Sequence, residues 1–127
     1  MVQTVRNIRI SQLPLLFFLD DDESILNLVS SILSKEFEVI TFSDPMECLK
    51  QAEESHPRLI ITDLNMPNLD GFEFLTMLLN HPSTNTIPVV CTSSSEDMEL
   101  RNKVIKKGAL GFLKKPYNYK NLGKNIN

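Results

Sequence analysis

The chain has 127 residues, of which 42% are hydrophobic and 23% are charged, as in one ordinary globular domain. Its formal net charge is −3 and it has no basic stripe, so direct nucleic-acid binding is not expected. No apolar run approaches the ~18 residues of a membrane-spanning helix, so no membrane contact is expected. Cys48 and Cys91 have no disulfide-framework or metal-site spacing, and they favour a reduced, cytoplasmic setting.

The first part of the chain contains an N-terminal segment and the start of an alternating pattern. Residues 1–14 are polar and mixed, so we expect 1–14 to be a leader or extension and 15–127 to be a single domain. The apolar run at 15–19 predicts a strand. Apolar residues then recur at i, i+3, i+4 and i+7 over 25–33, which predicts an amphipathic helix.

The same pattern of a strand followed by a helix continues through the middle of the chain. A second strand is predicted at 38–42. Asp44 and Pro45 are typical of a helix start, the aspartate as the N-terminal cap and the proline in the first turn. A third strand is predicted at 59–62 and a third helix at about 72–80.

The last third of the chain adds two strands, predicted at 87–92 and 109–113. A helix between them is predicted to open at 95–97 and to end before Gly108, a residue that suits a helix end. A last, poorly formed helix is predicted around Tyr119, Leu122 and Ile126. Strands that alternate with helices predict an α/β fold, a doubly wound five-stranded parallel sheet with helices on both faces.

Polar side chains follow four of the predicted strands. They are Asp20, Asp21, Asp22, Asp63, Thr92, Ser93, Ser94, Ser95, Lys114 and Lys115. The carboxyl ends of parallel strands form the ligand site of such sheets, so we expect these groups to meet. Carboxylates about 4 Å apart repel by about 1 to 4 kcal/mol per pair, so a cation must offset them. Oxygen ligands without histidine or cysteine favour Mg²⁺.

This set of groups suits a phosphoryl group carried on an aspartate. Asp63 would be the nucleophile, Mg²⁺ and Lys115 would neutralise phosphoryl oxygens, and Thr92 would hydrogen-bond to them. Each residue alone has a simpler interpretation: Asp22 or Ser24 as a helix cap, Thr92 as a buried strand residue, Lys115 as a surface lysine. The joint occurrence at four strand ends favours the functional interpretation.

Four segments, "FLDDD", "TDLNMPNLDGFEFL", "PVVCTSSS" and "GALGFLKKPY", together resemble the receiver domain of two-component response regulators, of the chemotaxis-receiver type. The resemblance covers about 15–126. It implies a flavodoxin-like sheet with strand order 2-1-3-4-5. It also implies that a sensor histidine kinase or a histidine phosphotransfer protein supplies the phosphoryl group and that an output protein reads the signal. The implied chemistry is limited to Mg²⁺-dependent self-phosphorylation and autodephosphorylation, without further enzyme activity.

The resemblance assigns roles to individual residues. Asp63 would be the phospho-acceptor, and Lys115 would pair with the phosphoryl oxygens across a cis bond to Pro116. Thr92 would be the switch hydroxyl and Phe112 the switch aromatic. The implied Mg²⁺ ligands are Asp20, Asp21, Asp63 and the backbone carbonyl of Asn65, with Asp20 acting largely through water.

Three features depart from the family pattern. Ser93 stands where the family usually has alanine or glycine, which would alter water access and dephosphorylation. Glu23 stands where many relatives have proline. The last helix is short and polar, which weakens the expectation that helix four, strand five and helix five form a partner face or a weak homodimer.

Two other classes of protein compete with this interpretation. In a haloacid-dehalogenase-type phosphatase, Asp20 of the Asp20-x-Asp22 loop would be the nucleophile, but 127 residues leave no room for the usual cap domain. A flavodoxin-like nucleotide binder, or a degenerate receiver, would be a binding module. The former needs a phosphate loop after the first strand, where the acids from Asp20 to Glu23 would repel an anion.

Overall fold

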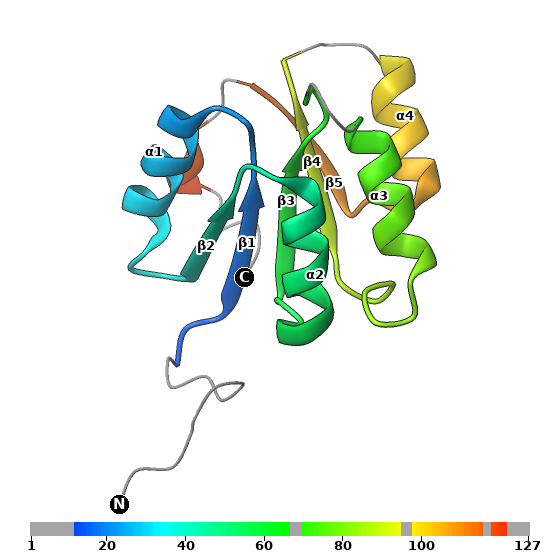
Figure 1. Cartoon of the computed structure of the whole chain (residues 1–127). Helices are drawn as coiled ribbons and strands as arrows, with labels where there is room; N and C mark the ends of the chain where they lie inside the picture. Colours follow the sequence, from blue (N-terminus) through cyan, green and yellow to red (C-terminus); the bar gives the residue numbers. More distant parts are fainter. Residues whose placement is uncertain (1–11, 67–69, 95–97, 116–117, 122–127) are drawn as a thin grey trace, which may run out of the picture.

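The computed structural model describes residues 12–66, 70–94, 98–115 and 118–121. A parallel five-stranded sheet in the order β2-β1-β3-β4-β5 forms its centre (Figure 1). The strands are β1 (Leu15–Leu19), β2 (Glu38–Phe42), β3 (Leu59–Asp63), β4 (Val89–Ser93) and β5 (Gly111–Lys114). The helices are α1 (Glu23–Leu33), α2 (Pro45–Ser55), α3 (Gly71–Asn80), α4 (Met98–Lys107) and a 3₁₀ turn, η1 (Tyr119–Asn121). The predicted fold class and strand order are confirmed.

The sheet separates two apolar cores because side chains alternate between its faces. One core joins the sheet to α2, α3 and α4, and it includes Phe17, Ile60 and Phe74. The other joins the sheet to α1, and it includes Phe18 and Ile61. Both faces of β1, β3 and β4 are therefore buried, which explains why these strands read as continuous apolar runs.

Aspartates cap three of the helices. The side chains of Asp22, Asp44 and Asp70 accept hydrogen bonds from main-chain N–H groups in the first turns of α1, α2 and α3. For Asp22 this confirms the simpler interpretation made from the sequence, because its carboxylate accepts from both the main chain and the hydroxyl of Ser24. These three acids are used in capping.

Some element boundaries differ from the sequence-based prediction. β4 begins at Val89 rather than at residue 87, since Pro88 has no N–H to give to a strand ladder. β5 begins at Gly111 rather than at residue 109. α4 ends before Gly108, as predicted, where the glycine has φ +134°. The predicted opening of α4 at 95–97 and most of the last helix, 122–127, lie outside the described residues, as do residues 1–11.

Candidate metal and phosphoryl-transfer site

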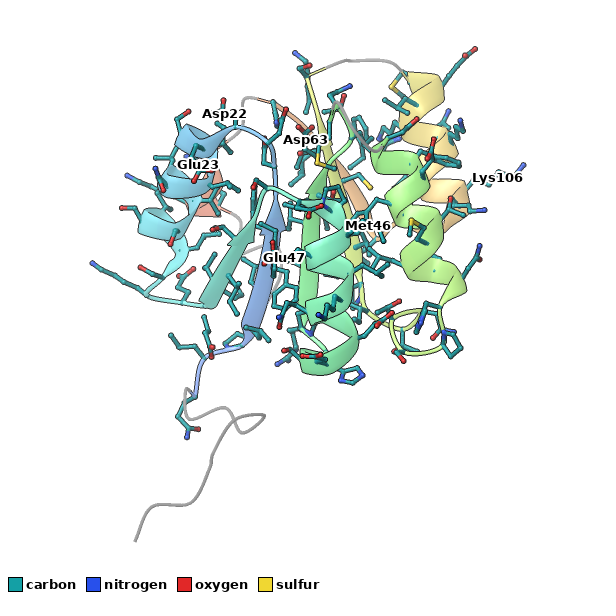
Figure 2. The ribbon with its side chains drawn as sticks, viewed as in Figure 1. Asp22, Glu23, Met46, Glu47, Asp63 and Lys106 are labelled. Carbon is teal, nitrogen blue, oxygen red and sulfur yellow. The ribbon has the colours of Figure 1, made fainter. Side chains whose placement is uncertain are left out.

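The strand register brings the polar strand ends together. Leu19 of β1 is paired with Thr62 of β3, so the next residue of each strand, Asp20 and Asp63, lies at the same edge of the sheet. Asp63 is in turn paired with Thr92 of β4. Figure 2 shows Asp63 at the end of β3, at the same edge as Asp22 in the loop that enters α1. The sheet edge therefore gathers side chains from three central strands.

A lysine from beyond β5 joins two buried carboxylates at this edge. The Nζ atom of Lys115 lies 2.8 Å from Oδ2 of Asp20 and 3.3 Å from Oδ2 of Asp63. Asp20 is fully buried and Asp63 is 2% exposed. The main-chain N–H of Lys115 donates to the carbonyl of Ser93 at 2.8 Å, which fixes the start of the lysine side chain beside β4. Lys115 thus supplies the nearest positive charge to both acids.

Burial and charge shift the pKa values of these groups in ways that bear on the chemistry. Burial raises the pKa of Asp63 above its usual value, although the N–H of Asn65 and the charge of Lys115 act against the rise. For Lys115, burial lowers the pKa, but the hydrogen bond and charge of Asp20, together with the charge of Asp63, raise it by more. The raised pKa of Lys115 favours its charged form, and the Lys115 charge in turn favours the ionised form of Asp63.

Three carboxylates lie close enough to share one cation. One oxygen atom each from Asp20, Asp21 and Asp63 lies within 4.8 Å of the other two. Asp21 is exposed, whereas the other two acids are buried. Among the ion pairs of the described residues, Lys115 compensates Asp20 and Asp63, so the three carboxylates keep an excess of negative charge, and all donor atoms of the set are oxygen. Such a set fits a hard divalent ion such as Mg²⁺.

Thr92 has a hydroxyl group with an unusual environment. The residue is fully buried, and its Oγ1 atom has no hydrogen-bond partner among the described residues. An unpaired buried hydroxyl costs about 1–3 kcal/mol, so its presence beside Asp63 calls for a ligand oxygen. The position of Thr92 at a strand end predicted a hydroxyl that binds a phosphoryl oxygen, and its unpaired Oγ1 atom is consistent with that role.

Phe112, the other predicted switch residue, lies on the opposite face of the sheet. It is partly buried and packs against the core shared with α2, α3 and α4. Thr92 is paired with Leu113, so Phe112 is one residue out of phase with the hydroxyl. The paired backbones of β4 and β5 provide one connection between Thr92 and Phe112.

Asn65 holds the loop that follows Asp63. Its main-chain N–H donates to Oδ1 of Asp63 at 3.1 Å. Its side-chain oxygen accepts from the hydroxyl of Ser93 at 2.9 Å. The sequence placed Ser93 among the polar strand ends, but it gave no signal that Asn65 would be its partner. Pro116 and the predicted cis bond after Lys115 lie outside the described residues.

Gly71 begins α3, one residue before the predicted start at about residue 72, and its close packing shapes the same loop. A Cβ atom at this position would lie 2.4 Å from Cα of Leu64 and 2.6 Å from the carbonyl oxygen of Asp63. Its N–H donates to the carbonyl of Leu64 at 3.3 Å. Only glycine lets the helix start approach the end of β3 this closely.

The model of the response regulator receiver domain family matches residues 16–127. The chain belongs to this family. The receiver is similar to the chemotaxis response regulator CheY4 of Vibrio cholerae, with 30% identity, a TM-score of 0.82 and coverage of 91% of this chain and 97% of that one. It is also similar to the Mn²⁺-bound form of the response regulator Rcp1, with 26% identity, a TM-score of 0.72 and coverage of 89% and 88%.

Curated relatives are longer proteins. The transcriptional regulatory protein PrrA of Mycobacterium tuberculosis is 34% identical over 105 residues, which are 82% of this chain but 44% of PrrA. The chain thus spans less than half the length of the first curated relatives that it matches, down to 7% for a hybrid signal transduction histidine kinase of Dictyostelium discoideum. The shared part is the receiver.

Membership of the family settles the general function. The receiver is a phospho-accepting domain of phosphorelay signalling, and domains of this family interact with histidine kinases or phosphotransfer proteins and with output domains. The family generally binds Mg²⁺ in an acidic pocket, and Asp20, Asp21 and Asp63 form an acidic cluster that could hold such an ion. Within the described ranges, each helix is too short or too polar to cross a membrane.

Proposed function

We propose that Asp63 accepts a phosphoryl group from a phosphohistidine of a sensor kinase or a phosphotransfer protein. Asp20, Asp21, Asp63 and the carbonyl of Asn65 would hold Mg²⁺, and Lys115 would neutralise the phosphoryl oxygens. The similar response regulator Rcp1 has a Mn²⁺-bound form, which supports the proposal that this chain binds a divalent ion. The observation that carries the proposal is that Lys115 pairs with two buried carboxylates beside an orphaned hydroxyl, that of Thr92.

In the transfer step, an oxygen of Asp63 attacks phosphorus while the bond from phosphorus to the donor nitrogen breaks. The imidazole leaves with the electron pair of that bond. Lys115, already 3.3 Å from Asp63, stabilises the charge that develops on the phosphoryl oxygens. Bound Mg²⁺ would supply a second positive charge to the same oxygens. The pocket alone would allow self-phosphorylation from small phosphodonors and slow hydrolysis by water.

Thr92 would report the presence of the phosphoryl group. Its hydroxyl gains a partner when a phosphoryl oxygen arrives on Asp63, the residue paired with it in the sheet. A switch from 1:99 to 99:1 needs about 5.5 kcal/mol of differential stabilisation, which a dianion that contacts a metal, a lysine and a hydroxyl can supply. The movement would reach Phe112 and the α4–β5 surface through the β4–β5 ladder and change affinity for an output protein.

Phosphorylation with acetyl phosphate and Mg²⁺, measured by intact mass, tests the proposal. Wild type should gain one phosphoryl group, Asp63→Asn should gain none, and Asp70→Asn should behave as wild type because Asp70 only caps α3. Retained labelling in Asp63→Asn would refute the assignment. If instead the chain turned over phosphate esters and lost this turnover in Asp20→Asn, the phosphatase alternative would hold.

The domain bounds, the cellular location and the oligomeric state are separate from this proposal. The family match over residues 16–127 supports 15–127 as the receiver, and an N-terminal leader or extension at 1–14 stays a prediction. Cytoplasmic location and a weak homodimer stay predictions, which fractionation of cells and sedimentation of the purified chain would test.

A further inference from the structure

A hydrogen-bonded contact joins the ends of β3 and β4 beside the phosphorylation site. The Ser93 hydroxyl donates to Oδ1 of Asn65 at 2.9 Å, and the main-chain N–H of Ser94 lies 3.4 Å from the same oxygen. A main-chain N–H can only donate, so the atom of the Asn65 amide that faces it is the oxygen. The orientation of the Asn65 side chain is therefore defined by β4.

Ser93 and Asn65 differ in burial, and the difference indicates that Ser93 is the fixed partner. Ser93 is fully buried at the end of a strand, whereas Asn65 is an exposed loop residue. Without a fixed donor, an exposed asparagine side chain would change rotamers freely. The hydroxyl of Ser93 therefore anchors the Asn65 loop to the rigid sheet.

Asn65 transmits this anchoring to the nucleophile. Its main-chain N–H donates to Oδ1 of Asp63 at 3.1 Å, while Oδ2 of Asp63 faces Lys115 at 3.3 Å. The orientation of the Asp63 carboxylate thus depends on the position of the Asn65 backbone. That backbone also carries the carbonyl that the proposed function assigns to Mg²⁺.

We infer that Ser93 is a positioning residue for the metal and phosphoryl site: through Asn65 it preorganises the Asp63 carboxylate and the Asn65 carbonyl for Mg²⁺. The inference rests on the proposed function. A single side-chain hydrogen bond of this kind corresponds to roughly a 2- to 10-fold effect on binding. Loss of the Ser93 hydroxyl should therefore weaken Mg²⁺ binding by about that factor and leave the fold intact.

The test is a double-mutant cycle on the full chain, with the Mg²⁺ dissociation constant measured by NMR titration of main-chain amide signals. Ser93→Ala and Asn65→Ala, which keeps the Asn65 carbonyl, should each weaken Mg²⁺ binding, and the double variant should be no weaker than the more affected single variant. Ser93→Thr, which keeps a hydroxyl, should restore binding. Ser43→Ala, an exposed serine after β2 at the same sheet edge, should match wild type.

Each outcome bears on one claim. The role of Ser93 would be overturned by a wild-type Mg²⁺ affinity in Ser93→Ala or by full additivity in the double variant. In either case, Mg²⁺ binding by wild type would leave the proposed function intact. Absence of Mg²⁺ binding by wild type would instead overturn the proposed function. If Ser93→Ala failed to fold, as judged by its NMR spectrum, Asn65→Ala on the exposed loop would decide: a wild-type affinity there would refute the anchoring.

Discussion

The ammonium group of Lys115 lies 2.8 Å from Oδ2 of Asp20, closer than the 3.3 Å that separates it from Oδ2 of Asp63. The lysine that the sequence assigned to phosphoryl oxygens is thus bound mainly to an acid assigned to the metal. Lys115 thus offsets part of the negative charge of the two buried carboxylates. A divalent ion that binds Asp20 would release Lys115 toward Asp63.

Replacement of Lys115 by methionine should therefore destabilise the metal-free receiver more than the Mg²⁺-bound one. Removal of one partner leaves two buried carboxylates without compensation, an effect of about 3 kcal/mol on the free energy of unfolding. Saturating Mg²⁺ should recover much of that loss because the ion replaces the missing charge. Urea denaturation with and without Mg²⁺ measures both quantities. Lys50→Met, an exposed lysine of α2, is the control, and an equal loss in both conditions would contradict the charge balance.

The raised pKa of Asp63 predicts a pH dependence of stability. Burial is the main cause of the rise, so folding favours the protonated acid over the ionised one. The contribution of Asp63 to stability is complete below its unfolded pKa of about 3.8 and is lost as pH rises through the higher folded value. In metal-free buffer, Asp63→Asn should therefore be more stable than wild type near pH 7, and the difference should shrink toward acid pH. Denaturation curves across this range measure it.

Asp22, the N-terminal cap of α1, should show the opposite dependence of stability on pH. Its pKa is lowered chiefly by hydrogen bonds from Ser24, so its contribution is present above pH 3.8 and is lost as pH falls through the lower folded value. Asp22→Ala should thus lose stability at neutral pH and approach wild type at acid pH. Suppose that the stability difference from wild type had the same sign at neutral pH in Asp63→Asn and in Asp22→Ala. Burial would then not be the main effect at Asp63, or capping would not be the main effect at Asp22.

The sequence predicted those residues of the site that lie at the carboxyl ends of the strands. Asp20, Asp63 and Thr92 each follow or end an apolar run, and parallel order with two-residue alternation places such residues at one edge. The contact between Ser93 and Asn65 was not predictable, because it joins residues far apart in sequence through a loop whose conformation no periodicity specifies. The preference of Lys115 for Asp20 depends likewise on distances that spacing does not encode.

Gly71 should tolerate no side chain. In Gly71→Ala, the added Cβ would meet the backbone of Leu64 and Asp63 at 2.4 and 2.6 Å, so the end of β3 has to shift. We expect a loss of about 1–3 kcal/mol in the free energy of unfolding, together with weaker Mg²⁺ binding and slower phosphorylation. Gly111→Ala is the matched control, since its nearest contact would be an ordinary 3.7 Å to Val90. Similar behaviour of the two variants would argue against the close approach.

The hydroxyl of Thr92 should lower the stability of the unphosphorylated protein and raise the stability of the phosphorylated one. Thr92→Val keeps the shape of the side chain and removes an unpaired buried hydroxyl, so we expect the unphosphorylated receiver to gain about 1 kcal/mol of stability. Thr84→Val is the matched control: that hydroxyl is equally buried but donates to the carbonyl of Leu78 at 2.7 Å, so its removal should cost about 1 kcal/mol.

Phosphorylation should reverse the order of stability of wild type and Thr92→Val. With the phosphoryl analogue beryllofluoride and Mg²⁺ bound, wild type gains a hydrogen bond that Thr92→Val cannot form, so its melting temperature should rise by more than that of the variant. Thermal denaturation of the two proteins, each with and without the analogue, gives the coupling directly. If Thr92→Val lost stability as Thr84→Val does, the resting hydroxyl would have a partner after all. Its movement toward phosphate would then have to break a bond, and Thr92 would oppose the switch instead of favouring it.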